Sequence, residues 1–144
     1  MASSGIEHIT SGLTKPRLAY SPAVRAGSFV FVSGQASVDA NGDIVYDTFE
    51  REMRRALANV LKILNAAGLG FEHVVSVRSY LAKQRDLKLY NQLYREFFKE
   101  PYPARTTIVN CLGTVVKFEI DVIAYDAGGS IPRISRRNLR KPRR

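Results

Sequence analysis

The run Phe29-Val30-Phe31-Val32 constrains the fold most, because its apolar residues are consecutive instead of alternate. Successive side chains of a β-strand point to opposite faces of the sheet. A strand that contains this run therefore needs apolar cover on both faces. Ser33, Gly34 and Gln35 extend the run, and the glycine permits close approach of another group to the backbone.

Hydrophobic periodicity predicts two helices and further strands around this run. An amphipathic stripe begins at Asp47 or Thr48 and ends at Gly68, a residue type that often terminates helices. A second stripe follows Asp86, which can serve as its N-cap. Strands are predicted at residues 6–9, 74–81, 103–109 and 115–125, an extended segment ends at 20–24, and a turn is predicted at 39–43.

The order of these elements predicts an α+β domain with one six-stranded mixed sheet and both helices on the same face. In a single chain, the other face of that sheet would be uncovered. This conflicts with the doubly apolar run at residues 29–32. A homo-oligomer that packs sheet against sheet resolves the conflict.

The net charge of +9 is concentrated at the C-terminus. Residues 127–144 carry seven Arg and Lys side chains and no acid, which leaves +2 for residues 1–126. We therefore predict a folded domain at 1–126 and a flexible basic tail at 127–144. Through this tail alone, binding to RNA or to another anionic surface is expected to be weak, non-specific and dependent on salt.

Other sequence features limit the location and the cofactors. No run approaches the roughly 18 apolar residues of a membrane span, and the N-terminus lacks the pattern of a secretory signal. Cys111 has no second cysteine to pair with, so a cytoplasmic location is favoured. His8, His73 and Cys111 are scattered, and no glycine-rich phosphate motif occurs, so we expect neither a metal nor a nucleotide cofactor.

Charged residues inside strand-like runs are the first candidates for a functional site. Arg105 follows Pro103, and a guanidinium suits bidentate binding of a carboxylate. An ordinary edge-strand arginine or a structural ion pair explains the residue about equally well. Thr107 lies two residues further on and shares the strand face of Arg105.

Glu119 interrupts an apolar strand, which is unfavourable unless the carboxylate is paired or lies in a cleft. It could act as a general base, or it could pair with Arg105, Lys117 or Lys83. Asp121 shares its face, and repulsion would raise the proton affinity of one of the two carboxylates. If residues 103–109 and 115–125 paired as a hairpin, Arg105 and Glu119 would reach the same end of the sheet.

Several motifs together resemble the RidA (YjgF-type) family of reactive-intermediate deaminases. They occur in the family's order between Leu18 and Tyr125. The motifs are Tyr20-Ser21-Pro22-Ala23-Val24, Phe31-Val32-Ser33-Gly34-Gln35, Leu64-Asn65-Ala66-Ala67-Gly68, Tyr90-Asn91-x-x-Tyr94-x-x-Phe97-Phe98, Pro103-Ala104-Arg105-Thr106-Thr107 and Phe118-Glu119-Ile120-Asp121-Val122-Ile123-Ala124.

The resemblance implies a chorismate-mutase-like fold, related to the ferredoxin-like fold, in a homotrimer with a central barrel, outer helices and clefts between subunits. It further implies hydrolysis of enamines and imines, such as 2-aminoacrylate and 2-iminopropionate, to 2-keto acids and ammonia without a metal or cofactor.

The resemblance also implies roles for single residues. Arg105 would hold the substrate carboxylate and Glu119 would orient or activate water. Thr107 stands where many family members have cysteine, so a role of the backbone carbonyl is retained and a thiol role is not. The turn at residues 110–114 is one residue shorter than in many deaminases. The remaining substrate-binding positions implied are Tyr20, Ser33, Gly34 and Asn91.

Two alternatives remain at this point. The first is an RNA-binding or endoribonuclease-type translation inhibitor that uses the basic tail. The second is a binder of carboxylate metabolites that does not turn them over.

Overall fold

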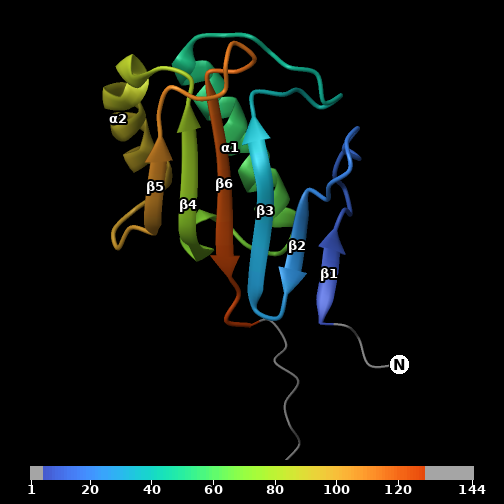
Figure 1. Ribbon diagram of the computed structural model, residues 1–144. Coiled ribbons are helices and arrows are strands. Elements are labelled where there is room, and N and C mark those ends of the chain that lie inside the picture. The colour runs from blue at the N-terminus through green and yellow to red at the C-terminus, as the bar shows by residue number, and fades with distance from the viewer. Residues whose placement is uncertain (1–4, 129–144) are drawn as a thin grey trace, which may run out of the picture.

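One six-stranded mixed sheet carries two helices on a single face (Figure 1). The computed structural model describes residues 5–128. The strands lie in the order β1-β2-β3-β6-β4-β5, and every neighbouring pair is antiparallel except β4 and β5. The strands are β1 (Ile6–Ile9), β2 (Ala23–Ala26), β3 (Phe29–Ala36), β4 (Val74–Leu81), β5 (Ala104–Ile108) and β6 (Phe118–Tyr125). The predicted fold class is confirmed.

Helix α1 (Phe49–Ala66) follows the predicted stripe closely. The side chain of Thr48 accepts a hydrogen bond from the backbone N–H of Arg51, which caps the first turn. Gly68 has a φ of +78°, a left-handed conformation that glycine adopts without steric cost, and it ends the helix as predicted. The predicted turn at 39–43 forms as well, closed by a hydrogen bond from Gly42 N–H to the Asp39 carbonyl.

Helix α2 (Leu87–Phe97) begins directly after a 3₁₀ turn at Gln84–Asp86. Asp86 occupies the N-cap position, but its side chain makes no capping hydrogen bond. The predicted position of Asp86 at the start of the helix is therefore confirmed, but its side chain does not cap the first turn. The physical reason is that the preceding turn already holds Asp86 in a helical conformation, with φ −84° and ψ −6°.

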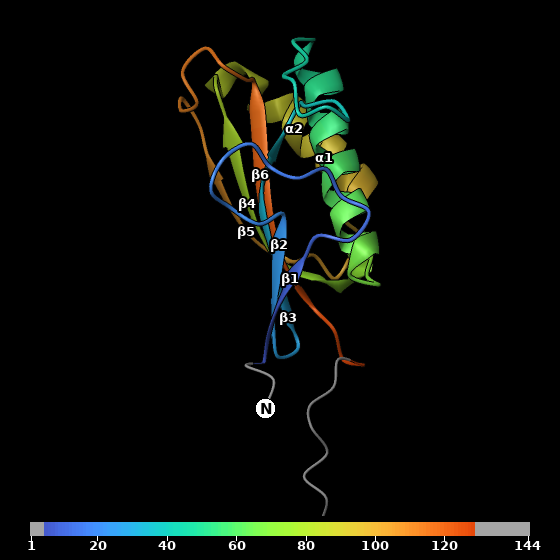
Figure 2. The same ribbon diagram turned by 90° about the vertical axis from the view of Figure 1, so that its right-hand side faces the viewer.

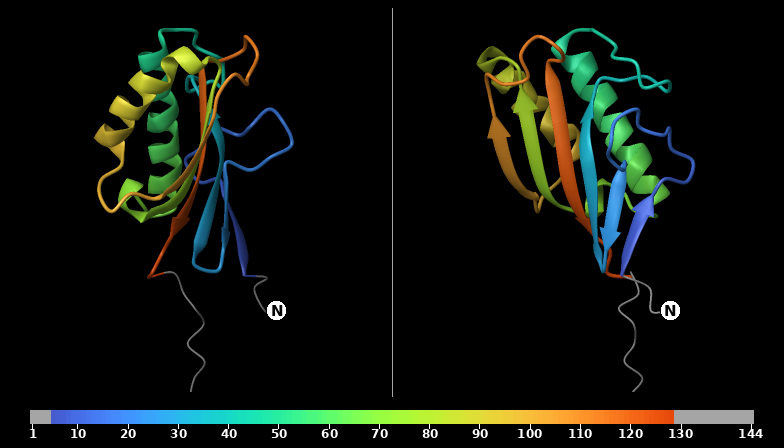
Figure 3. Two further views of the ribbon diagram at one scale, coloured as in Figure 1. Left: turned by 60° about the vertical axis from the view of Figure 1, so that its left-hand side comes forward. Right: turned by 45° about the vertical axis from the view of Figure 1, so that its right-hand side comes forward.

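The core lies between the sheet and the helices, which pack against each other and against the same face (Figure 3). Phe118 on β6 is fully buried and meets Phe49 of α1 and Tyr90 of α2, with ring centroids 5.9 Å away in both pairs. The alternation predicted for the last strand is confirmed, since Phe118, Ile120, Val122 and Ala124 are all buried.

The predicted hairpin between residues 103–109 and 115–125 is wrong, because β4 separates β5 from β6. The α2 crossover places β5 parallel to β4 at the sheet edge. The strongly apolar β6 inserts instead between β3 and β4, where neighbours flank it on both sides. The polar sequence Ala104-Arg105-Thr106-Thr107-Ile108 suits an edge strand, which borders solvent.

The second face of the sheet is covered by no element within residues 5–128 (Figure 2). Phe29, Phe31 and Tyr125 lie on this open face with 44%, 46% and 41% of their surface exposed. Phe29 and Tyr125 pack together, with ring centroids 5.3 Å apart. In one chain, therefore, the helices cover one apolar face of β3, and its other apolar face is exposed.

The predicted flexible tail lies almost wholly outside the described residues, of which 128 is the last. Within that described part, no helix is both long enough and apolar enough to cross a membrane.

Candidate active site

Arg105 points to the helix side of edge strand β5. Its partner in the parallel ladder is Val77, a residue buried under the helices. Its guanidinium carbon lies 4.7 Å from the ring centroid of Tyr94 and 5.2 Å from that of Tyr90. These tyrosines are four residues apart on α2 and so share one helix face. Cation–π attraction to the two rings holds the guanidinium in place.

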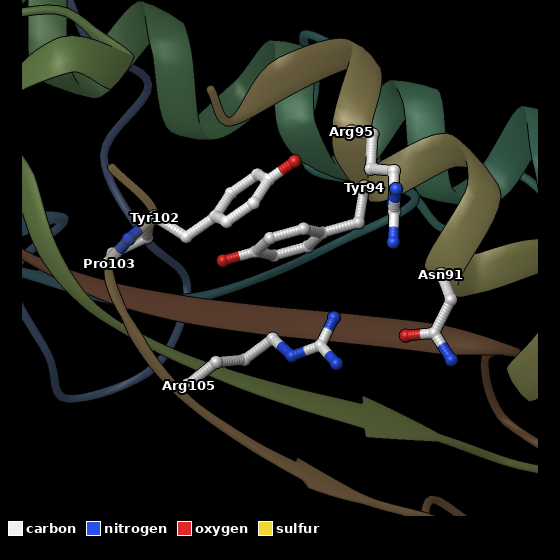
Figure 4. Close-up of a pocket in the computed structure, with 6 residues that line it drawn as sticks. All are labelled: Asn91, Tyr94, Arg95, Tyr102, Pro103 and Arg105. Atoms are coloured by element: carbon white, nitrogen blue, oxygen red, sulfur yellow. The ribbon is translucent and has the colours of Figure 1, made fainter. Parts of the chain in front are cut away.

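A cavity of about 470 Å³ opens beside this guanidinium. Asn91 and Arg105, both predicted site residues, lie together here (Figure 4). The sequence interpretation did not assign the other four lining residues to the site; they are Tyr94, Arg95, Tyr102 and Pro103. Within residues 5–128, Arg105 has no acidic partner, so its hydrogen-bond donors are available to an anion.

Tyr94 contributes a second feature to the cavity. Its hydroxyl oxygen is buried and has no hydrogen-bond partner among the described residues. Burial raises the pKa of Tyr94 to about 12, so the hydroxyl keeps its proton at neutral pH. A buried donor without a partner is unfavourable for the fold.

Glu119 lies on the open face of the sheet, because its neighbours Phe118 and Ile120 both point into the core. Its carboxylate has no hydrogen-bond or ion-pair partner within residues 5–128. Burial, followed by the negative charge of Asp121, raises the pKa of Glu119. Asp121 itself accepts hydrogen bonds from Arg78 and Tyr80, at 2.8 and 3.0 Å. The arrangement therefore distinguishes the two carboxylates: Asp121 is paired and Glu119 is available.

Lys117, another partner considered for Glu119, is engaged elsewhere within one chain. The ammonium of Lys117 binds the fully buried carboxylate of Glu52, at 3.0 Å, and the carbonyl of Asp47. Glu52 was not singled out in the sequence, because its position among charged residues of α1 gave no indication of burial.

Gly34 lies directly beside the Glu119 carboxylate. The ladder between β3 and β6 shifts register between Val32 and Gln35, which marks a bulge. A Cβ atom at position 34 would overlap Oε1 of Glu119 and would lie 3.3 Å from its Cδ. We predicted that another group lies close to the backbone of this glycine, and that group is the Glu119 carboxylate.

Ser33 and Tyr20 lie on the β3 side of the molecule. The Ser33 hydroxyl donates to the Ser21 carbonyl at 2.6 Å, and the Ser33 N–H donates to the Pro22 carbonyl at 2.9 Å. Tyr20, two residues before Pro22, is 51% exposed and lines a second cavity of about 360 Å³ beside α1. Neither residue lines the Arg105 cavity.

Thr107 shares the helix-side face of Arg105, as predicted. It pairs with Ser79, whose hydroxyl oxygen accepts a hydrogen bond from Tyr90 at 2.7 Å. The Thr107 hydroxyl oxygen is buried and has no partner among residues 5–128. Thr107 therefore has an unused polar side-chain atom in addition to its backbone carbonyl.

The predicted site residues thus form two groups in one chain. Arg105, Asn91 and Thr107 lie at the β5 edge, on the helix side. Glu119 and Gly34 lie at the β3–β6 bulge, with Ser33 and Tyr20 on the β3 side. The expectation that Arg105 and Glu119 meet on one hairpin is wrong, because they lie on opposite faces and β4 separates their strands. A site that uses both groups needs two copies of the chain.

Helical spacing in the sequence gives a partial indication that Asn91, Tyr94 and Arg95 belong to one site. Residues four apart share a helix face, so Asn91 and Arg95 form one row and Tyr90 and Tyr94 form another. The tyrosines fit equally well in the apolar stripe of α2, and this concealed the role of the Tyr94 ring and hydroxyl at the cavity.

Comparison with known proteins places the chain in a family. The family model described as Endoribonuclease L-PSP matches residues 12–126. A RutC family protein of Pyrococcus horikoshii is 38% identical over 118 residues, which are 81% of this chain and 94% of the relative. The human 2-iminobutanoate/2-iminopropanoate deaminase is 35% identical over 107 residues, which are 73% of this chain and 78% of the relative.

Solved structures agree with this. The crystal structure of an endoribonuclease-like protein from Thermotoga maritima superposes with a TM-score of 0.73 and 33% identity, covering 81% of this chain and 93% of that one. The chain belongs to the endoribonuclease L-PSP family, the RidA or YjgF-type family that its motifs resemble.

Proposed function

We propose that the protein hydrolyses enamines and imines of short 2-keto acids to the keto acid and ammonia. The observation that carries the proposal is the Arg105 guanidinium, which has no acidic partner within residues 5–128 and is held under two tyrosine rings at an open cavity. Such a group suits bidentate binding of a substrate carboxylate. The human relative that bears the name 2-iminobutanoate/2-iminopropanoate deaminase supports this substrate class.

In the proposed reaction, water attacks the carbon of the C=N bond. The π electron pair moves to nitrogen, which takes up a proton, and a tetrahedral intermediate forms. The hydroxyl proton of this intermediate then passes to nitrogen, the C–N bond breaks, ammonia leaves and the hydroxyl-bearing carbon becomes the carbonyl of the keto acid. Glu119, whose pKa is raised, suits the role of the base that accepts the water proton and returns it to nitrogen. Arg105 positions the carbon by holding the adjacent carboxylate.

We propose that the cleft forms between copies of the chain in a homotrimer. One copy would supply Arg105, Asn91 and Thr107, and its neighbour would supply Glu119, Gly34, Ser33 and Tyr20. The separation of these two groups within one chain and the apolar open face both support this assembly. A small carboxylate substrate would bind at this junction.

The test is to generate 2-iminopropionate with an amino-acid oxidase and to follow keto-acid release. The wild type should accelerate release, and Arg105→Ala should reduce kcat/KM by about 100-fold or more. Lys88→Gln, an exposed charge change on α2 at a residue that does not line the cavity, serves as the control. Saturable keto-acid binding through Arg105 without imine hydrolysis would instead identify a non-catalytic binder.

The shared cleft has its own test. Arg105→Ala and Glu119→Gln subunits, each inactive alone, are unfolded together, mixed equally and refolded. If one site takes Arg105 and Glu119 from different copies, about a quarter of the sites are intact and activity returns to that level. Failure of the mixture to regain activity, with both variants refolded, argues against a shared site.

A further inference from the structure

The cavity beside Arg105 carries a second guanidinium, that of Arg95. Arg95 lies on α2 one turn after Asn91, and both residues line the cavity together with Arg105. Figure 4 shows Arg95 and Asn91 extending from successive turns of α2 on the side of Tyr94 where the Arg105 guanidinium ends. Two cations from two different elements therefore border one space.

Neither cation is neutralised within residues 5–128. Arg95 has no acidic partner there, and its backbone carbonyl accepts a hydrogen bond from the ammonium of Lys99 at 2.7 Å, which brings a third positive charge to this end of α2. The adjacent Glu96 is occupied elsewhere, because it binds Arg54 of α1 at 2.7 Å. No acidic residue in the described part of the chain lines the cavity. Its electrostatic potential therefore favours a ligand with more than one negative charge.

The size of the cavity points in the same direction. The cavity has a volume of about 470 Å³ and is open to solvent. A three-carbon imino acid has only six non-hydrogen atoms and leaves much of this space empty.

We infer that the preferred substrates are imines of four- or five-carbon 2-keto dicarboxylic acids, with Arg105 binding the carboxylate next to the C=N carbon and Arg95 binding the distal carboxylate. This inference rests on the proposed function for the role of Arg105. Arg95 is thus a residue that determines specificity, and a monocarboxylate leaves its charge unused.

The experiment compares two keto acids that differ only at the far end of a five-carbon chain. They are 2-oxopentanedioate, which ends in a carboxylate, and 2-oxopentanoate, which ends in a methyl group. Calorimetric titration of the full-length wild type should show binding of the diacid about 10-fold or more tighter, because hydrogen bonds between a guanidinium and a carboxylate are strengthened by their charges. Arg95→Gln should remove most of this preference, and Arg95→Lys should retain part of it. Lys88→Gln should keep it fully.

Several outcomes overturn the inference. These are equal affinity of the wild type for both acids, binding of neither acid, and a preference that survives in Arg95→Gln. Hydrolysis of the two matching imines then separates the two proposals. An Arg95-dependent preference in binding without hydrolysis leaves the inference standing and removes the proposed function. Hydrolysis of both imines without an Arg95-dependent preference supports the proposed function and removes the inference about Arg95.

Discussion

At the scale of single residues, Glu119 combines three properties that a general base requires. Its carboxylate has no partner within residues 5–128, its pKa is raised by burial and by Asp121, and it borders the backbone at Gly34. A carboxylate with a raised pKa binds a proton more readily at the pH of the reaction than an exposed one does. The same burial makes its ionised form unfavourable for the fold.

Glu119→Gln is therefore expected to reduce activity and to increase stability at neutral pH. Because the folded chain binds this proton more tightly than the unfolded chain, the penalty is absent below the ordinary pKa near 4.5 and complete above the raised one. The melting temperature at pH 7 should rise by roughly 1–4 °C, and the difference from wild type should vanish near pH 4. Activity should fall by about 100-fold or more. Thermal melts across pH and imine hydrolysis provide the measurements.

A loss of stability at pH 7 in Glu119→Gln would show that the carboxylate has a stabilising partner. Unchanged activity would transfer the role of base to another group.

At the scale of elements, the bulge in β3 gives Glu119 its position. The register shift between Val32 and Gln35 leaves Gly34 facing the carboxylate, where no side chain would fit without displacing it. Two other elements position Arg105. Edge strand β5 carries the residue, and α2 carries the tyrosine rings that hold its guanidinium. The site thus depends on the sheet edge, on the bulge and on one helix face.

Gly34→Ala should reduce activity strongly and stability only slightly. The atom nearest the new methyl group is the end of the Glu119 side chain, which can rotate away, so the stability cost should stay below about 1 kcal/mol. The displaced carboxylate should lower kcat by about 10-fold or more. Chemical denaturation and imine hydrolysis measure the two effects.

The double variant Gly34→Ala/Glu119→Gln is the control for this pair. If Gly34 acts through Glu119, the double variant should be no less active than Glu119→Gln alone. Independent, additive losses would show that Gly34 contributes in another way.

At the scale of the whole molecule, the open face of the sheet is the surface through which the proposed assembly would form. Phe29, Phe31 and Tyr125 expose apolar surface there, and Val24 of β2 pairs with Phe31 at its centre. An apolar sheet face of this kind is typical of a protein interface. If the proposed cleft joins two copies, activity depends on this face although Arg105 lies on the other side.

Phe31→Asp should convert the oligomer to monomers and abolish imine hydrolysis, because a carboxylate buried in an apolar interface without a partner is strongly unfavourable. Light scattering after gel filtration measures the mass. Tyr46→Lys, at an aromatic residue that is 69% exposed just before α1, should leave both mass and activity unchanged. A Phe31→Asp variant that keeps full activity as a monomer would contradict the shared cleft.

The sequence by itself determined most of the local structure. Apolar periods of 3.6 and 2 residues are properties of neighbouring positions, so they located α1, α2, β4 and β6 closely and assigned the buried face of β6. The extended segment predicted to end at residue 24 became β2, at Ala23–Ala26. Unusual charges in strands also drew attention to Arg105 and Glu119 without any tertiary information.

Only the tertiary structure decided which strands are neighbours and which side chains meet. The insertion of β6 between β3 and β4 separated the strand of Glu119 from that of Arg105, and the packing of α2 over β5 brought Arg95 and Tyr94 to Arg105. The physical reason is that these contacts join residues far apart in the chain. Their free energy depends on core packing across the whole sheet, which local periodicity does not encode.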